Sequence, residues 1–287
     1  MNLKPKPIQP PAAIYQTPLR PSPSEVAERI DAALTTAPQP VTVYFRADDI
    51  AIPEPTMHRL LETFSAHRMP LALALVPAWL TPSRWAVFQR WDADHPDLWC
   101  WHTHGWRHVN HEAVGRKSEF GPSRSQAEIL DDLKRGMTRL HSLLGDRFSP
   151  IFTPPWNRCS AETLERLSSI GYRAVSRDIG ATPAPPPSLV EIPIHVDLHT
   201  RKERSVPDGW KALFLQIENA FQRGACGFMI HHQRMNENAF RFLDDLLGVL
   251  RAQPSVRPAA MDTLPARSSP SASHQNDVRN SSTRLCS

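Results

Sequence analysis

The stretch VTVYFRADDI, residues 41–50, predicts a buried strand over 41–47 that runs into two adjacent aspartates, Asp48 and Asp49. Its β-branched and aromatic residues favour a strand, and its unbroken apolar character is typical of a parallel sheet covered on its faces by helices. Aspartates at a strand end are also common as turn or helix-capping residues. The pair alone therefore does not define a functional site.

Six further apolar segments repeat this pattern. Strands are expected at residues 71–76, 98–102, 150–153, 172–176, 189–194 and 227–231. Amphipathic helices are expected from about residue 24, from Pro55, over 125–144 and over 238–250, where apolar residues recur every three or four positions. Alternating strands and helices predict an α/β fold with a parallel sheet, and seven strands can close into a (β/α)7 barrel. An open doubly wound sheet is the alternative, but no Gly-rich phosphate turn follows the first strand.

Proline marks the limits of the expected domain. Seven of the 29 prolines lie in residues 1–23, a density that prevents a regular helix or strand. Residues 253–287 are rich in Ser, Pro and Arg and offer little to bury. We expect a folded domain over 24–252 between disordered tails at 1–23 and 253–287.

Charge and composition exclude several classes of protein. Of the 33 Lys/Arg and 29 Asp/Glu residues, four and three lie in residues 1–40, and four and two lie in 253–287. The centre is therefore almost neutral and lacks the clustered charge of a nucleic-acid groove. No apolar run approaches the roughly 20 residues of a membrane helix, the first residues show no secretory signal, and the four cysteines show no CxxC spacing. These features predict a cytoplasmic enzyme without nucleic-acid or membrane partners, and they leave its oligomeric state open.

Polar residues follow most of the expected strands at the point where each strand ends. Besides Asp48-Asp49, these are HTHGWRH at 102–108 with Asn110 and His111 behind it, TPPWNR at 153–158, His195-Val-Asp197 and His231-His232. Because the carboxyl ends of parallel strands meet at one rim, we expect these side chains to be neighbours in space.

Such residues could hold a metal ion. Two neutral imidazoles and one carboxylate leave an open position on Zn²⁺, where bound water can have its pKa lowered to about 7. A second carboxylate can take the proton of that water, and a histidine across the site can return one to a leaving group. The same donor set also forms the Fe(II) site of some oxygenases. A metal-free barrel that acts as a binding module is the non-enzymatic alternative.

The order of the motifs resembles that of the NodB-homology polysaccharide deacetylases, carbohydrate esterase family 4. The family's TFDDG, H-[ST]-x-x-H, RPP[YFW] and late L-x-H motifs are matched by residues 46–50 (RADDI), 104–108 (HGWRH), 153–156 (TPPW) and 229–231 (MIH). The resemblance spans about residues 41–250. It implies a deformed (β/α)7 barrel and a metal-dependent hydrolase that removes an N-acyl group, acetyl in the first place, from a carbohydrate or related amine.

The resemblance also implies roles for individual residues. Asp48 would be the general base, and Asp49, His104 and His108 would bind a divalent metal, in the first place Zn²⁺. The backbone N–H of Trp156 would stabilise the oxyanion, and His231 would be the general acid with Asp197 as its partner. We further expect the substrate, a small molecule or oligosaccharide, to contact Trp106, Arg158, His195 and His232. His232 also competes with His231 for the role of the acid.

Three departures indicate a divergent branch of the family. Ile50 replaces the family's glycine, Thr153 replaces the arginine that orients the base, and the late acidic motif with tryptophan is not recognisable. Arg46 or Arg158 is expected to take the place of the missing arginine. The absence of a secretory signal favours a soluble sugar, a precursor or another N-acyl compound over a mature cell-wall polymer.

Overall fold

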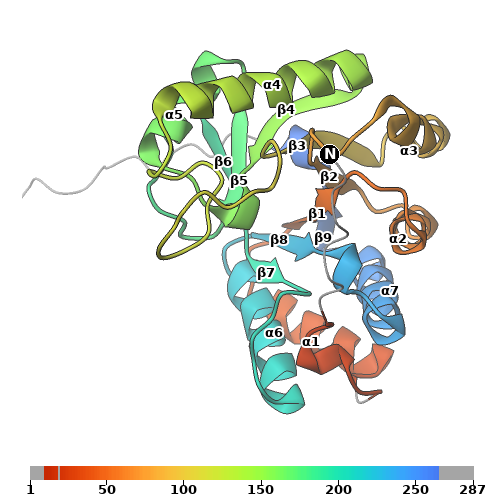
Figure 1. The fold of residues 1–287 in the computed structure, drawn as a ribbon. Coiled ribbons are helices and arrows are strands. Elements are labelled where there is room, and N and C mark those ends of the chain that lie inside the picture. The colour runs from red at the N-terminus through yellow and green to blue at the C-terminus, as the bar shows by residue number, and fades with distance from the viewer. Residues whose placement is uncertain (1–9, 19, 265–287) are drawn as a thin grey trace, which may run out of the picture.

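A computed structural model describes residues 10–18 and 20–264, in which strands and helices alternate along the chain (Figure 1). The strands are β1 (Val41–Ile50), β2 (Leu71–Leu75), β3 (Trp99–His104), β4 (Phe148–Thr153), β5 (Ala174–Asp178), β6 (Val190–Ile194), β7 (Val196–Asp197), β8 (Ala225–Ile230) and β9 (Val256–Pro258). The helices are α1 (Pro23–Thr35), α2 (Pro55–Ala66), α3 (Pro82–Asp94), α4 (Gln126–Leu144), α5 (Ala161–Ser169), α6 (Val206–Phe221) and α7 (Glu237–Ala252). Every strand and helix predicted above is present. The segments α3, α5, α6, β7 and β9 are additional.

The strands form one parallel sheet that curls into a nearly closed barrel. Their order is β6-β5-β4-β3-β2-β1-β8-β7, and β9 pairs with the beginning of β1. The two end strands of this order, β6 and β7, are separated in the chain only by His195. One continuous stretch of chain therefore pairs first with β5 and then with β8. This stretch brings the two edges of the sheet together and confirms the predicted deformed (β/α)7 barrel.

Successive residues of β1 face different parts of the core. Val43 and Phe45 belong to the large cluster that the sheet forms with the surrounding helices, whereas Tyr44 belongs to a cluster inside the barrel. The two-residue period of a strand puts Arg46 and Asp48 on the same side as Tyr44. Both are buried, with 0% and 3% of their surface exposed. The polar end of β1 therefore lies within the barrel, close to its rim.

All helices in the described residues except α2 begin at a residue whose side chain caps the first turn, and the helices cover the outside of the sheet. Ser22 and Ser125 each form a capping box at the start of α1 and α4, because a glutamate three residues later bonds back to the serine N–H. Each helix buries a stripe of apolar side chains, as α7 does with Phe242, Leu243, Leu246 and Leu250. No helix in the described part of the chain is long and apolar enough to cross a membrane.

The packed part of the chain extends beyond the boundaries expected at residues 24 and 252. Tyr15 is completely buried, with its ring 5.7 Å from that of Trp210 and 6.1 Å from that of Phe242. The side-chain amides of Asn236 and Asn238 donate hydrogen bonds to its carbonyl oxygen.

At the other end of the domain, β9 pairs with β1 and Met261 is buried. The expectation of disordered tails is therefore wrong for residues 10–18, 20–23 and 253–264. Tyr15 anchors the first of these segments and β9 anchors the last. Neither segment shows the helical or strand periodicity from which its order could be predicted. Residues 1–9 and 265–287 of the expected tails lie outside the described residues.

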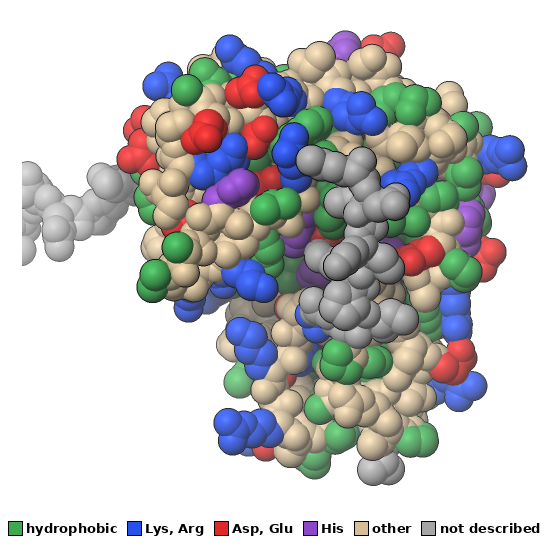
Figure 2. Space-filling model, viewed as in Figure 1, with side chains coloured by type: hydrophobic (Ala, Val, Ile, Leu, Met, Phe, Trp, Pro, Cys, Tyr) green, Lys and Arg blue, Asp and Glu red, His purple; other side chains and the backbone are tan. Residues whose placement is uncertain are grey.

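Three strands run further toward the rim than the sequence indicates, and one of them is β5, which continues to Asp178 instead of ending at residue 176. Strand β1 continues to Ile50, and β3 continues to His104 instead of ending at His102. His102 therefore lies inside the barrel, with no exposed surface, and His104 stands at the strand end. Figure 2 shows histidine side chains in the hollow at the centre of the face that is turned to the viewer.

Candidate active site

A bulge at the end of β1 lets both adjacent aspartates contribute to one site. In a regular strand, Asp48 and Asp49 would point to opposite faces. Here the register with β2 shifts between Ala47 and Ile50, and Asp49 has the left-handed backbone conformation, with φ of 63°. A bulge of this kind re-aims a side chain. Asp48 stays inside the barrel, and Asp49 turns toward the histidines that follow β3.

Asp49, His104 and His108 form a cluster that could hold a metal ion. Asp49 Oδ1 lies 3.5 Å from Nε2 of His104 and 3.1 Å from Nε2 of His108. One ligand atom from each residue lies within 4.8 Å of the other two, and no other such group of three occurs in residues 10–18 and 20–264. The three residues predicted as metal ligands are thus brought together.

The donor set fits a divalent ion such as Zn²⁺. The carbonyl oxygen of Thr153 lies 3.0 Å from Nδ1 of His104, so Nδ1 carries the proton and donates it there. This bond leaves the lone pair of Nε2 facing Asp49, the usual arrangement of a metal-ligating histidine and its backbone partner. Burial lowers the pKa of His104, but Asp49 and Asp48 more than offset it and the net shift is upward. Protons and a metal ion would therefore compete for this imidazole.

Arg46 holds Asp48 with two hydrogen bonds. Arg46 Nε lies 2.8 Å from Oδ1 of Asp48, and a terminal guanidinium nitrogen lies 2.9 Å from Oδ2. Burial raises the pKa of Asp48, but Arg46 and then His104 and His231 outweigh it, so the pKa is lowered overall. Asp48 is therefore an ionised carboxylate with a fixed orientation, as a general base requires.

Thr153 stands where the family has an arginine, and the sequence left Arg46 and Arg158 as possible replacements. The arginine that contacts Asp48 is Arg46, on β1. Arg158 instead donates to the carbonyl of Lys117 on the rim. Arg46 is itself fixed, because it donates to Ser176 Oγ at 2.8 Å and to the side-chain oxygen of Asn157 at 2.7 Å.

Thr153 forms a different contact inside the barrel. Its hydroxyl lies 3.0 Å from Nε2 of His102. Burial, with a smaller contribution from Arg46, lowers the pKa of His102 to about 3. His102 is therefore neutral at ordinary pH, and it fills the interior beneath the cluster without adding a charge.

Trp156 lies directly against the candidate metal site. It sits in the short turn Pro155–Asn157 after β4, and both Trp156 and Asn157 have left-handed backbone conformations with φ of 58°. The Trp156 ring is 4.5 Å from the ring of His108, and the Trp79 ring is 5.9 Å from His108. The residue whose backbone N–H is the predicted oxyanion donor thus lies beside the cluster.

His231 follows β8 and reaches the same site. It lies close enough to Asp48 to lower the pKa of that carboxyl. Its backbone N–H donates to Nδ1 of the buried His199 at 3.2 Å, which fixes the chain at this point. His232 points elsewhere and pairs with Glu54 at 3.2 Å. Of the two histidines, His231 is therefore the one placed beside the base.

Asp197 is not the direct partner of His231. Its Oδ1 accepts hydrogen bonds from the backbone N–H groups of His199 and Thr200, both at 2.9 Å. Among the described residues no hydrogen bond joins Asp197 to His231. Asp197 instead caps the backbone at His199, whose ring accepts the N–H of His231.

Two residues expected to contact the substrate are held by contacts within the protein. His195 lies between β6 and β7, and its Nδ1 accepts the backbone N–H of Gly227, the third residue of β8, well below the rim. Trp106 packs against the apolar cluster of α4, α5 and β4. Both expectations rested on distance from a strand end along the sequence, which does not show which way a side chain points.

Three residues at the site were not assigned a role from the sequence. Glu119 is completely buried beside the His104–His108 loop, where burial raises the pKa of its carboxyl more than the backbone donors around it lower it. Asn157 links Arg46 to Asp178, whose Oδ1 accepts its amide at 2.8 Å. Asp178 ends β5, so the strand-end rule could have found it. Asn157 belongs to the TPPWNR segment that follows β4, so the same rule points to it, and only Glu119 has no comparable signal in the sequence.

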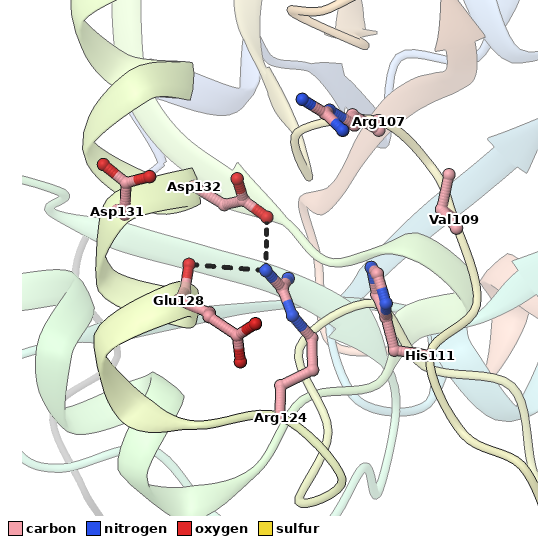
Figure 3. A pocket seen from close by; sticks show the side chains of 7 residues that line it. All are labelled: Arg107, Val109, His111, Arg124, Glu128, Asp131 and Asp132. Carbon is pink, nitrogen blue, oxygen red and sulfur yellow. Dashed lines mark hydrogen bonds and ion pairs between the residues drawn. The ribbon is translucent and has the colours of Figure 1, made fainter.

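A separate cavity of about 260 Å³ lies beside the loop (Figure 3). It is lined by Arg107, Val109, His111, Arg124, Glu128, Asp131 and Asp132. Arg124 crosses it and donates to Asp132 at 2.6 Å and to the carbonyl of Glu128 at 3.4 Å. None of these side chains belongs to the Asp49 cluster, so the cavity is not the candidate active site.

Comparisons with known proteins agree with the fold. Residues 35–175 match the family model for polysaccharide deacetylase. A Mycobacterium smegmatis protein described as a polysaccharide deacetylase has a TM-score of 0.55 and 16% identity over 78% of this chain and 88% of that one. A CE4 esterase from Streptococcus mutans has a TM-score of 0.51 and 15% identity over 78% and 85%. A CE4 pseudoenzyme from Bacillus anthracis has a TM-score of 0.47 and 16% identity over 75% and 62%. No curated protein matches.

Proposed function

Because this chain belongs to the polysaccharide deacetylase family, we propose that it is a zinc-dependent deacetylase that hydrolyses an N-acetyl group on a soluble sugar or related amine. One observation carries the proposal. The Asp49, His104 and His108 donors converge within 4.8 Å, next to an aspartate that Arg46 keeps ionised. A binding module would need neither the ligand cluster nor the second, separately oriented carboxylate.

When bound to these three residues, Zn²⁺ would supply an acidified water as nucleophile and would polarise the acyl carbonyl. Asp48 would take one proton from the water that attacks the carbonyl carbon. The backbone N–H of Trp156 donates to the carbonyl oxygen as negative charge develops on it. His231 gives a proton to the nitrogen as the carbon–nitrogen bond breaks. The products are acetate and the free amine.

The position of Asp48 favours hydrolysis over oxygenase chemistry. A 2-His-1-carboxylate iron site needs a single aspartate, which Asp49 provides. The bidentate contact between Arg46 and Asp48 holds a second carboxylate ready to accept a proton. A general base of this kind serves water attack on an amide.

Acetate release tests the proposal. The zinc-loaded protein is incubated with N-acetylglucosamine oligomers of increasing length and with acetylated monosaccharides, and acetate is quantified enzymatically. We expect release by the wild type and none above background by Asp48→Asn. The Asp48→Asn variant should retain its zinc, because Asp48 is not one of the three clustered ligands. Equal acetate release by both proteins, or zinc-independent release, would contradict the proposal.

A further inference from the structure

A buried carboxylate holds the loop that carries the second metal-ligating histidine. Glu119 has no exposed surface. Its Oε2 accepts the backbone N–H groups of Trp106 and His108, each at 3.2 Å, and its Oε1 accepts that of Arg107 at 2.6 Å. Three successive N–H groups therefore converge on one side chain. Such a concave set of backbone donors is an anion-binding arrangement, here filled by the protein itself.

The conformation of the loop depends on this contact. Gly105 and His108 both have left-handed backbones, with φ of 60° and 56°. For a residue other than glycine this conformation is uncommon and needs support from its surroundings. A Cβ atom on Gly105 would lie 2.2 Å from Glu119 Oε2, so the glycine is required for the carboxylate to come this close.

Glu119 is itself firmly anchored. Phe120, the next residue, is completely buried, and its carbonyl accepts the N–H of Ser160 and the hydroxyl of Thr163 at the start of α5. The carbonyl of Glu119 accepts a guanidinium N–H of Arg124, which also bonds to Asp132 on α4 (Figure 3). The backbone of Glu119 and Phe120 is therefore attached to α4 through Arg124 and to the start of α5.

We propose that Glu119 is a positioning residue that holds His108 in its ligating orientation before a metal ion arrives. The inference rests on the proposed function, because it takes Asp49, His104 and His108 as the metal ligands. With the loop fixed in advance, binding does not have to order residues 105–108, and affinity is higher for that reason. Removing the carboxylate would leave three backbone N–H groups without their acceptor and would free the strained turn at His108.

The variants Glu119→Gln and Glu119→Ala test this proposal, and Glu112→Gln is the matched control. The Glu112 side chain also accepts hydrogen bonds, from the backbone N–H and the hydroxyl of Ser123, but none from residues 105–108. Glu119→Gln keeps the volume of the side chain but places an amide donor against backbone donors. It therefore keeps the proposal testable if the alanine variant fails to fold.

Two measurements separate positioning from general stability. The zinc affinity of metal-free protein is measured by competition with a chromogenic chelator. We expect it to fall about 10–100-fold for Glu119→Gln, the usual effect of losing an outer-shell partner, and to stay unchanged for Glu112→Gln. Hydrogen exchange of the amides of residues 106–108, measured without zinc, should become faster only in the Glu119 variants.

The outcomes distinguish this inference from the proposed function. Wild-type zinc affinity combined with wild-type amide protection in Glu119→Gln would overturn the inference. If wild-type protein binds no zinc, the proposed function fails. Slow exchange at 106–108 in the wild type and fast exchange in Glu119→Gln would then still show that the carboxylate holds the loop, but its role toward a metal would be refuted.

Discussion

Replacing Arg46 with methionine removes the only cation hydrogen-bonded to Asp48 in the described part of the chain. Both side chains are buried, with 0% and 4% of their side-chain surface exposed, and two hydrogen bonds join them. Breaking a buried pair by removing one partner typically destabilises a protein by about 3–5 kcal/mol. The neighbouring arginine of an aspartate typically lowers its pKa by about 1–3 units. In Arg46→Met, burial would then dominate and raise the pKa of Asp48.

The sign of the pH dependence follows from these two states. In the wild type the pKa of Asp48 is lowered. Its ionisation therefore stabilises the fold above the pKa of the unfolded chain, and that stability is lost as the pH falls through the folded value. The Arg46→Met variant lacks this contribution. Its stability deficit should be largest near neutral pH. The deficit should shrink as the pH falls through the raised pKa of Asp48 in the variant, and further below about 4, the pKa of an unperturbed aspartate, as the wild type loses its own contribution.

The assay is the pH profile of kcat/KM for acetate release from an aryl acetate, with zinc content measured in parallel. We expect the acid limb to move up by about 1–3 pH units in Arg46→Met, and less in Arg46→Lys, which keeps the charge but loses the two-pronged contact. Arg158→Met is the matched control, because Arg158 donates to the Lys117 carbonyl and not to Asp48. If the control moves the acid limb and Arg46→Met does not, the assignment of the orienting arginine is wrong.

Three further predictions address the acid, the base and the N-terminal anchor. His231→Ala should lose about 10²–10⁴-fold in turnover of an N-acetyl sugar but little with an aryl acetate, whose leaving group needs no proton; an equal loss with both substrates would argue against a role as the acid. Asp49→Asn should lose zinc and activity together, whereas Asp48→Asn should keep zinc and lose turnover; zinc analysis showing the reverse would exchange the two roles. Tyr15→Ala should lower the free energy of unfolding by about 3–5 kcal/mol, because a fully buried ring leaves a cavity. Tyr15→Phe should change it little, since the buried hydroxyl has no hydrogen-bond partner in the described chain; similar losses in both variants, measured by urea unfolding, would show that the ring is not the anchor.

The arrangement of the barrel and its cluster could be predicted because both depend on short-range sequence patterns. Apolar segments separated by amphipathic helices indicate parallel strands, and their carboxyl ends share one rim wherever the chain runs next. Asp49 lies at the end of β1, and His104 and His108 lie at and after the end of β3, with only β2 between the two strands. The structure brings the three side chains together. The bulge that turns Asp49 toward the histidines could not be predicted, since strand periodicity alone separates adjacent side chains.

The remaining differences come from contacts between segments far apart in the sequence. Arg46 and Arg158 were equally plausible partners for Asp48 until the barrel placed one inside and the other on the rim. Glu119 reaches the loop after β3 only because Phe120 is fixed against α5. Tyr15 lies in a proline-rich stretch whose composition indicates a tail, yet its ring packs against Trp210 of α6 and Phe242 of α7.

The most direct test of the account is an anomalous diffraction map, collected at the zinc absorption edge from crystals of the zinc-loaded protein. The account predicts one strong peak at bonding distance, about 2.0–2.2 Å, from an oxygen of Asp49 and from Nε2 of His104 and His108, with Asp48 outside bonding distance. A zinc peak at another place in the chain, or none between these three residues in crystals soaked with excess zinc, would contradict it.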